Sequence, residues 1–413
     1  MDLLWRKDVL LQHDTRVFRY RDDKRQGKSC TTLYARSNDL KSPSWLKISE
    51  RRIASEWDAW FTEIADSQAL SQGDSIRIIL CPRDDFDGDH SAILKCLPFS
   101  SESFNTIAEG LELHRSLAVL VERGVPTISR IPCSPHKVVY TLRAQHNMEG
   151  DMALTITYFK GTTPNNATTT TAKTHAMLLG CSDKDTQFVC DKLSEARATA
   201  FSPFTLIKAF LELEMGRRFR AVDKTVSEAL RAAEGEQGMS KSGSYPNSSV
   251  EAYTDTFMLK TALEAWKAQL VKLVRYSAKD FVGEGSVHAD DVDPREYLEQ
   301  LIYEYDIKIA HCERVLQVTS LTFQMQTTDL TRQDGREMRA IALLTMVFLP
   351  ATFVATVMAV PTFDFRTITS IPQWSIYLVL FLPLTAVVLV VYFIWHRCLE
   401  NRDRGLSQAD MII

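Results

Sequence analysis

The stretch FLPATFVATVMAVPTFDF, residues 348–365, decides how the C-terminal part of this sequence is interpreted. It lies in an apolar segment, Ile341 to Val360, that contains 20 residues without a charge. As a helix, such a segment would be about 30 Å long, which matches the hydrocarbon core of a bilayer. Threonines interrupt the apolar side chains at Thr345, Thr352 and Thr356. The segment is therefore either a plain membrane anchor or a helix with one polar face along a path.

A second apolar segment follows after 13 residues and runs from Trp374 to Trp395. Tryptophan at both ends is typical of a span whose ends lie at the two membrane interfaces. The alternative is a pair of buried core helices, but two such segments in succession are difficult to cover in a soluble core. We therefore expect a two-helix transmembrane region over residues 341–395 and a tail over 396–413.

Flanking arginines predict the orientation of these spans, because positive charge concentrates on the cytosolic side. Six arginines lie outside the two segments: Arg332, Arg336, Arg339, Arg397, Arg402 and Arg404. The connecting loop contains only Arg366. We expect an integral membrane protein with both termini in the cytosol, in the plasma membrane in preference to the mitochondrial inner membrane.

Composition restricts what the rest of the chain does. The formal net charge of -4 argues against nucleic-acid binding. The eight cysteines form no C-x-x-C pair, which argues against zinc and redox motifs. The sequence has no HExxH, GxSxG or GxGxxG motif, so we expect no enzyme activity and no catalytic residues. Residues 1–45 carry mixed charges and are predicted to form a poorly ordered arm.

Residues 46–202 are predicted to fold as an α/β or α+β domain. Ser75–Cys81 and Met152–Phe159 are rich in β-branched residues and indicate strands. The segment 137–144 precedes the second of these and is expected to pair with it. Residues 104–126 have helical spacing and are expected to end at Gly124, with Pro126 beyond.

Residues 203–340 are predicted to form a helical bundle with a long stalk helix. Pro294 is expected to open that helix, and no further proline occurs before Pro350, so one helix of about 65 residues is expected to continue into the membrane. A heptad seam indicates helix-on-helix packing or supercoiling. Its members are Leu298, Ile302, Tyr305, Ile309, Cys312, Leu316, Thr319, Phe323, Gln326 and Leu330.

On a helix, several residues in and just before the first apolar segment would lie on one face. At 100° per residue, Met338, Thr345, Thr352 and Thr356 fall within about 40° of one another, and Ile341 and Leu349 flank them. On one interpretation the hydroxyls replace part of an ion's hydration shell and the apolar rings restrict passage. On the other, each threonine bonds back to the carbonyl four residues earlier and packs against a neighbouring helix.

Residues 338–363, MRAIALLTMVFLPATFVATVMAVPTF, resemble the first transmembrane segment of the CorA family of magnesium transporters. FLPATFVA is similar to the family's F-[ML]-P-x-T-F-[IV]-A stretch, and the chain most resembles the divergent CorA-like membrane proteins of fungi. The resemblance implies a homopentamer with an N-terminal α/β domain, a stalk helix and two C-terminal spans. It also implies an axial ion path, faced here by Met338, Ile341, Thr345, Leu349, Thr352 and Thr356.

The sequence departs from that family at the outer mouth of the path. Counted from Pro350, the family's Gly-Met-Asn signature falls on Ala359, Val360 and Pro361, none of which has a side-chain oxygen. The only acid of the outer loop is Asp364. The resemblance implies a divalent cation of the magnesium type as substrate and regulator, without a covalently bound cofactor. The alternative is a nonconducting, membrane-anchored scaffold or sensor.

Two acidic segments are further candidates for metal binding. Asp84–His90, DDFDGDH, offers oxygen ligands but lacks the spacing of an EF-hand. The loop containing Asp290, Asp291 and Asp293 offers carboxylates that sense cations if they meet between subunits. In both segments a solvated loop is the simpler interpretation.

Overall fold

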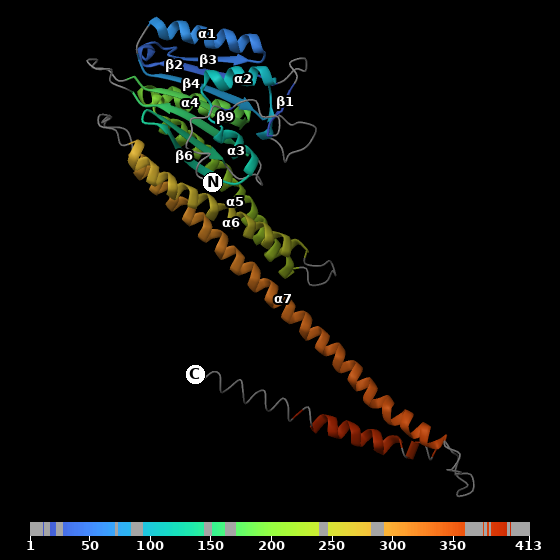
Figure 1. Cartoon of the computed structure of the whole chain (residues 1–413). Coiled ribbons are helices and arrows are strands. Elements are labelled where there is room, and N and C mark those ends of the chain that lie inside the picture. The colour runs from blue at the N-terminus through green and yellow to red at the C-terminus, as the bar shows by residue number, and fades with distance from the viewer. Residues whose placement is uncertain are drawn as a thin grey trace. The chain divides into compact units, whose positions relative to one another are not determined.

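The structure is a computed structural model. It describes residues 11, 17–21, 28–70, 73–83, 94–143, 151–161, 171–238, 247–281, 293–359, 375, 378–379, 381–394 and 397. The chain divides into two compact units, Met1–Ser320 and Leu321–Ile413. Figure 1 labels the helices and strands.

A mixed sheet of seven strands organises the first unit, in the order β3-β2-β4-β9-β8-β7-β6. Its strands are β2 (Cys30–Arg36), β3 (Leu46–Arg51), β4 (Ser75–Pro82), β6 (Thr127–Ser134), β7 (Lys137–Arg143), β8 (Ala153–Phe159) and β9 (Lys173–Cys181). Strands β4 and β9 are parallel, and the other neighbours are antiparallel. A separate parallel pair joins β1 (Arg19–Tyr20) to β5 (Cys96–Leu97). The predicted strands and the pairing of residues 137–143 with β8 are confirmed.

Helices cover both faces of the sheet, because alternate residues of its central strands enter two different cores (Figure 1). Ile78 packs towards α4 (Asp183–Ala196) and α5 (Pro203–Gly238). The next residue, Ile79, packs with the helices of the other face. Those helices are α1 (Ala54–Leu70), α2 (Ser101–Gly110) and α3 (Ser116–Arg123).

The predicted arm over residues 1–45 is wrong for its last third. Strand β2 lies inside the sheet between β3 and β4, and Leu33 and Ala35 are buried in its core. The strand is short, comes after a run of mixed charges and has no alternation of buried and exposed residues, so it does not stand out in the sequence. It pairs with β3, the next strand along the chain, and with β4, which follows only after α1, and local composition does not indicate the second pairing.

The helix predicted over residues 104–126 is divided into α2 and α3. Glu112 has a left-handed φ of 50°, and this residue interrupts the helical backbone. A Cβ atom on Gly110 would lie 2.3 Å from Cε1 of Phe61. The Phe61 side chain of α1 therefore packs so close to the end of α2 that a residue other than glycine at position 110 would displace it. The predicted end at Gly124 is confirmed: this C-cap glycine has a φ of 63°.

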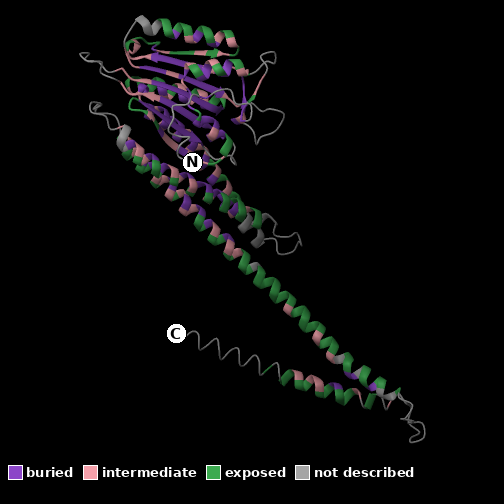
Figure 2. Ribbon diagram, viewed as in Figure 1, coloured by how far each residue is buried: buried purple, intermediate pink, exposed green. Residues whose placement is uncertain are grey.

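Three long helices form a bundle beside the sheet: α5, α6 (Asn247–Asp280) and α7 (Pro294–Met358). The predicted start at Pro294 and the continuous helix beyond it are confirmed. The seam residues Leu298, Tyr305 and Cys312 are fully buried. Beyond Thr319 the seam is no longer covered, and Phe323 and Leu330 are exposed. Figure 2 shows this change along α7 from buried to exposed residues.

The second unit contains the end of α7 and an apolar helix, Phe381–Ile394. The molecule therefore has an N-terminal mixed α/β domain, a long helix and a C-terminal apolar helix, as the sequence predicts. Trp374 and Trp395, the predicted ends of the second span, lie outside the described residues.

Candidate functional site

The apolar end of α7 is the part of the described chain that is long and apolar enough to cross a bilayer, judged by length and composition. Its most apolar window of 18 residues has a mean hydropathy of 1.9, and only 12% of that window is buried. A core helix of a soluble protein would be mostly covered. Helix Phe381–Ile394 is also apolar but shorter.

All six residues of the predicted path face are solvent-exposed on α7. Met338, Ile341 and Leu349 are 73%, 63% and 71% exposed. Thr345, Thr352 and Thr356 are also exposed. Pro350 and Val354, in contrast, are buried. The six residues, called the path face below, thus form one uncovered stripe that contains three apolar and three hydroxyl side chains.

Each hydroxyl of the path face donates its hydrogen to the helix backbone. Thr345 Oγ1 lies 2.9 Å from the Ala342 carbonyl oxygen. Thr352 Oγ1 lies 3.1 Å from that of Phe348 and 2.9 Å from that of Leu349. Thr356 Oγ1 lies 2.6 Å from the carbonyl oxygen of Thr352.

These bonds determine what the hydroxyls offer to a ligand. A threonine hydroxyl has one hydrogen and two lone pairs. With the hydrogen directed to a carbonyl of the same helix, the lone pairs remain for a partner outside it. Such an oxygen accepts from water or contacts a cation, but it does not donate to an anion. The back-bonding alternative and the path interpretation are therefore compatible in this helix.

Pro350 adds a further acceptor to the same region. It lies inside α7, and proline has no N–H to donate to the carbonyl four residues earlier, that of Met346. Sequence reasoning identified the proline as part of the FLPATFVA stretch. A proline at this position removes the usual intrahelical donor of that carbonyl oxygen.

The residues predicted for the outer mouth are only partly within the described chain. Ala359 directly follows α7, and its backbone nitrogen lies 3.1 Å from the Ala355 carbonyl oxygen and 3.2 Å from that of Thr356. Val360, Pro361 and Asp364 lie outside the described residues.

The candidate metal ligands receive no support where they are described. Asp293 caps α7, since its Oδ1 accepts from the Arg295 N–H at 3.0 Å. Asp290, Asp291 and the segment Asp84–His90 lie outside the described residues. Within the described ranges, no group of three or more His, Cys, Asp or Glu side chains is arranged to hold a metal ion.

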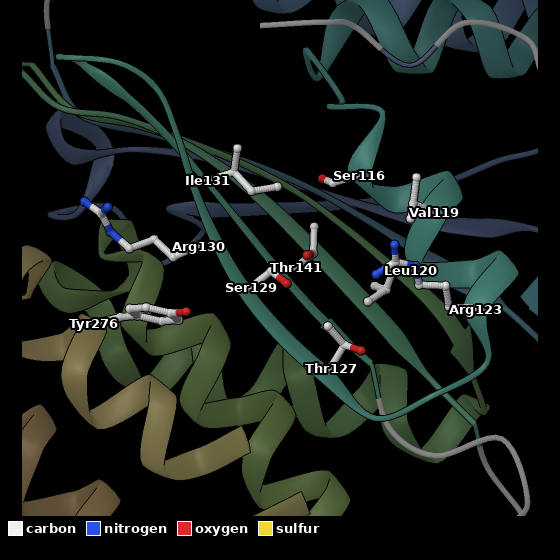
Figure 3. A pocket seen from close by; sticks show the side chains of 10 residues that line it. All are labelled: Ser116, Val119, Leu120, Arg123, Thr127, Ser129, Arg130, Ile131, Thr141 and Tyr276. Atoms are coloured by element: carbon white, nitrogen blue, oxygen red, sulfur yellow. The ribbon is translucent and has the colours of Figure 1, made fainter. Parts of the chain in front are cut away.

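A cavity of about 230 Å³ lies at the edge of the sheet, between α3, strands β6 and β7, and Tyr276 of α6 (Figure 3). Its lining includes Arg123 and Arg130, several hydroxyl side chains and no carboxylate. Without an acidic side chain in its lining, this cavity does not suit a divalent cation.

A buried polar cluster joins α5 to α6, and sequence reasoning missed it. Arg218 Nε on α5 lies 2.7 Å from Glu214 Oε1, and the Arg218 guanidinium lies 5.1 Å from the ring centre of Trp266 on α6. Burial raises the pKa of Glu214, and Arg218 opposes that shift. The only signal in the sequence is the four-residue spacing of Glu214 and Arg218, which is common on solvent-exposed helix faces.

Ion pairs between the helices add to this cluster. Lys267 of α6 pairs with Asp306 of α7. Lys260 of α6 lies 2.8 Å from Glu313, and Lys308 lies 2.6 Å from Asp223 of α5. Polar contacts therefore hold the first part of α7 to both α5 and α6.

No protein-family model and no curated protein matches the sequence. Among solved structures, the full-length CmaX protein matches at 10% identity and a TM-score of 0.47, over 89% of this chain and 98% of that one. The CorA magnesium transporter from Methanocaldococcus jannaschii matches at 9% identity and a TM-score of 0.48, over 88% of this chain and 96% of that one.

The cytoplasmic domain of ZntB from Vibrio parahaemolyticus matches at 10% identity and a TM-score of 0.38, over 74% of this chain and all of that one. Because these identities are 10% or less, function has to be inferred from this chain's own residues. Over most of its length, the chain is similar to solved structures of CorA, CmaX and ZntB.

Proposed function

We propose that this chain is a homo-oligomeric membrane protein in which α7 lines a path for divalent metal cations of the magnesium type. The observation that carries the proposal is the path face, with its three hydroxyls bonded back to the helix. Acceptor oxygens on one face of an apolar helix, here two turns and then one turn apart, suit a partly hydrated cation.

The apolar members of the path face have a complementary role. Met338 and Ile341 precede the threonines, Leu349 lies between Thr345 and Thr352, and all three apolar side chains expose most of their surface. Rings of such side chains exclude water where they approach one another, and a hydrophobic constriction of this kind gates by dewetting. A cation would then pass from one hydroxyl ring to the next across apolar barriers.

A path requires several copies of the chain, because one helix encloses nothing. Helix α7 presents large apolar side chains for such contacts along the part that precedes the path face. They are Tyr303, Ile307, Val318, Leu321 and Met325, each between 45% and 66% exposed. Exposed apolar side chains in this number favour burial against a partner. The FLPATFVA resemblance implies that five copies associate.

A second candidate function is that of a nonconducting scaffold or sensor anchored in the membrane. The sequence at the outer mouth favours it, because Ala359, Val360 and Pro361 supply no side-chain oxygen to select a hydrated ion. The two functions differ in one property, the passage of ions.

Cation flux into liposomes that contain the purified full chain separates them. We expect a magnesium, cobalt or nickel gradient to drive entry of the cation, followed with a dye enclosed in the vesicles. Protein-free liposomes and liposomes with heat-inactivated protein are the controls. If none of the three cations enters under any gradient, transport is excluded and the scaffold is the better account.

A further inference from the structure

Three arginines lie on α7 immediately before its apolar end: Arg332, Arg336 and Arg339. All three are exposed. At 100° per residue they lie about 120° to 180° from Thr345, within an arc of about 60°. They thus occupy the side of the helix opposite the path face. We propose that these three residues, the arginine face, bind anionic phospholipid headgroups at the membrane surface.

The positive charge of the arginine face is not neutralised by an ion pair within the described part of the chain. No ion pair there joins any of its three members to a carboxylate. Asp334 lies about 20° from Thr345, on the path side, and Glu337 lies about 80° from it. Asp329 shares the arginine side but lies farther from the apolar segment, so three cations face one acid.

The distance of these residues from the apolar run suits headgroups. At about 1.5 Å per residue, Arg339 lies about 3 Å, Arg336 about 8 Å and Arg332 about 14 Å before Ile341. The polar zone on each side of a bilayer is about 5 to 8 Å thick. Arg339 and Arg336 therefore reach phosphate depth, and Arg332 lies about 6 Å outside the polar zone, still within a Debye length of an anionic surface.

The chemistry of the side chain fits the same ligand. A guanidinium group offers paired N–H donors to two phosphate oxygens and remains charged at any physiological pH. Neutral phospholipids also carry a phosphate, but their headgroup has a compensating cation. The arginine face should therefore prefer lipids with net negative charge, with a gain of about fivefold in affinity for each arginine.

Lipid binding on this side has a consequence for the rotation of α7 about its own axis. A helix whose arginines contact headgroups directs the opposite side, with Thr345, Thr352 and Thr356, away from the lipid. The arginine face would therefore help to turn the path face towards the interior of an oligomer. This inference rests on the proposed membrane span but does not require that the protein conducts.

Lipid retention tests the inference on the full chain. Detergent-solubilised protein is titrated with phosphatidylglycerol or with phosphatidylcholine, and native mass spectrometry counts the lipids retained. We expect wild type to retain phosphatidylglycerol in preference. We expect Arg332→Gln/Arg336→Gln/Arg339→Gln to weaken that binding by about a hundredfold. High salt should remove the preference as well.

The matched control removes three exposed arginines elsewhere: Arg220→Gln/Arg231→Gln/Arg314→Gln. This variant has the same net charge and should retain the preference of wild type. Equal retention of the two lipids by wild type, or equal losses in the two triple variants, would overturn the inference. A preference for phosphatidylglycerol in a protein that passes no cation would support the arginine face while excluding the proposed transport.

Discussion

At the scale of single residues, burial decides the charge of several groups in the α/β domain. His175 of β9 is buried beside the ring of Phe159, at 5.2 Å between ring centres. Burial, and next the charge of Arg77, lowers the pKa of His175 to about 3. The side chain is therefore neutral at physiological pH, and it contributes to the pH dependence of folding instead of acting as a sensor near neutral pH.

His175 makes a prediction about stability in acid. The unfolded chain binds a proton below a pKa of about 6.5, whereas the folded chain does so only near the lowered pKa. Neutral His175 therefore makes its full contribution to the free energy of unfolding above pH 6.5, and this contribution is lost as the pH falls towards 3. Between pH 7.5 and pH 5, we expect a loss of about 2 kcal/mol. Denaturant titration of detergent-solubilised wild type and His175→Gln measures it, and parallel pH profiles of the two would contradict this account.

The ion pair between Arg143 and Asp151 makes a second prediction at this scale. Its nitrogen and oxygen lie 2.7 Å apart, both side chains are buried, and Arg143 also donates to the carbonyl oxygens of Leu120 and Val121. Removing one partner leaves a buried charge unpaired, so we expect Asp151→Asn to destabilise the fold by about 3 to 5 kcal/mol.

The control for that variant is the exposed pair Lys47–Glu63, in which nitrogen and oxygen lie 3.6 Å apart. Glu63→Gln should cost about 1 kcal/mol or less, because solvent screens both charges. Urea unfolding of both variants compares the two effects. A loss in Asp151→Asn no larger than that in Glu63→Gln would show that the buried pair contributes little.

At the scale of elements, the sequence identifies the features that periodicity determines and misses those that depend on distant partners. The continuous helix α7 is evident because apolar residues repeat from Leu298 onwards without a proline until Pro350. The division of α2 from α3 is not evident, because residues 104–126 keep helical spacing across it. Phe61 of α1 packs at that break, and the spacing of apolar residues within 104–126 does not indicate a contact with another helix.

The close packing of Phe61 of α1 against Gly110 of α2 leads to a prediction for a larger side chain at position 110. Gly110→Ala places a methyl group 2.3 Å from the Phe61 ring, and we expect a loss of about 1 to 3 kcal/mol from overpacking. Adding Phe61→Leu should recover part of it. Gly216→Ala is the matched control: nothing lies within 4 Å of its added Cβ, and it should stabilise α5 by about 0.5 to 1 kcal/mol. Thermal unfolding measures all three, and similar effects at both glycines would contradict the proposed contact.

At the scale of the whole molecule, the path face has a function only when copies of the chain assemble. The sequence already indicates the six residues of this face, since their spacing is a consequence of helix geometry alone. It does not reveal where the three hydroxyl hydrogens point, and that detail distinguishes a cation-accepting face from a row of mixed donors. Nor does periodicity predict an oligomer, because the side chains proposed to contact a partner resemble any exposed apolar stripe.

The assembly itself is open to a direct test. We expect the detergent-solubilised full chain to have the mass of a homo-oligomer, with five copies by resemblance, in light scattering after size exclusion. Leu321→Glu/Met325→Glu should reduce that mass, because the charges would be placed on the exposed apolar part of α7. A monomeric wild-type protein would be incompatible with a path along the axis of an assembly.

The most direct measurement of the central claim compares cation flux in liposomes for Thr352→Val and Thr385→Val. Valine keeps the shape of threonine and removes its hydroxyl. Thr385 is the matched control, because it bonds back to the Phe381 carbonyl oxygen at 2.8 Å but lies nearly buried on the other apolar helix. We predict that Thr352→Val lowers the rate of magnesium entry by about tenfold or more, the equivalent of about 1.4 kcal/mol, while Thr385→Val leaves it near that of wild type. Equal rates in wild type and Thr352→Val would contradict the claim that this face lines the path.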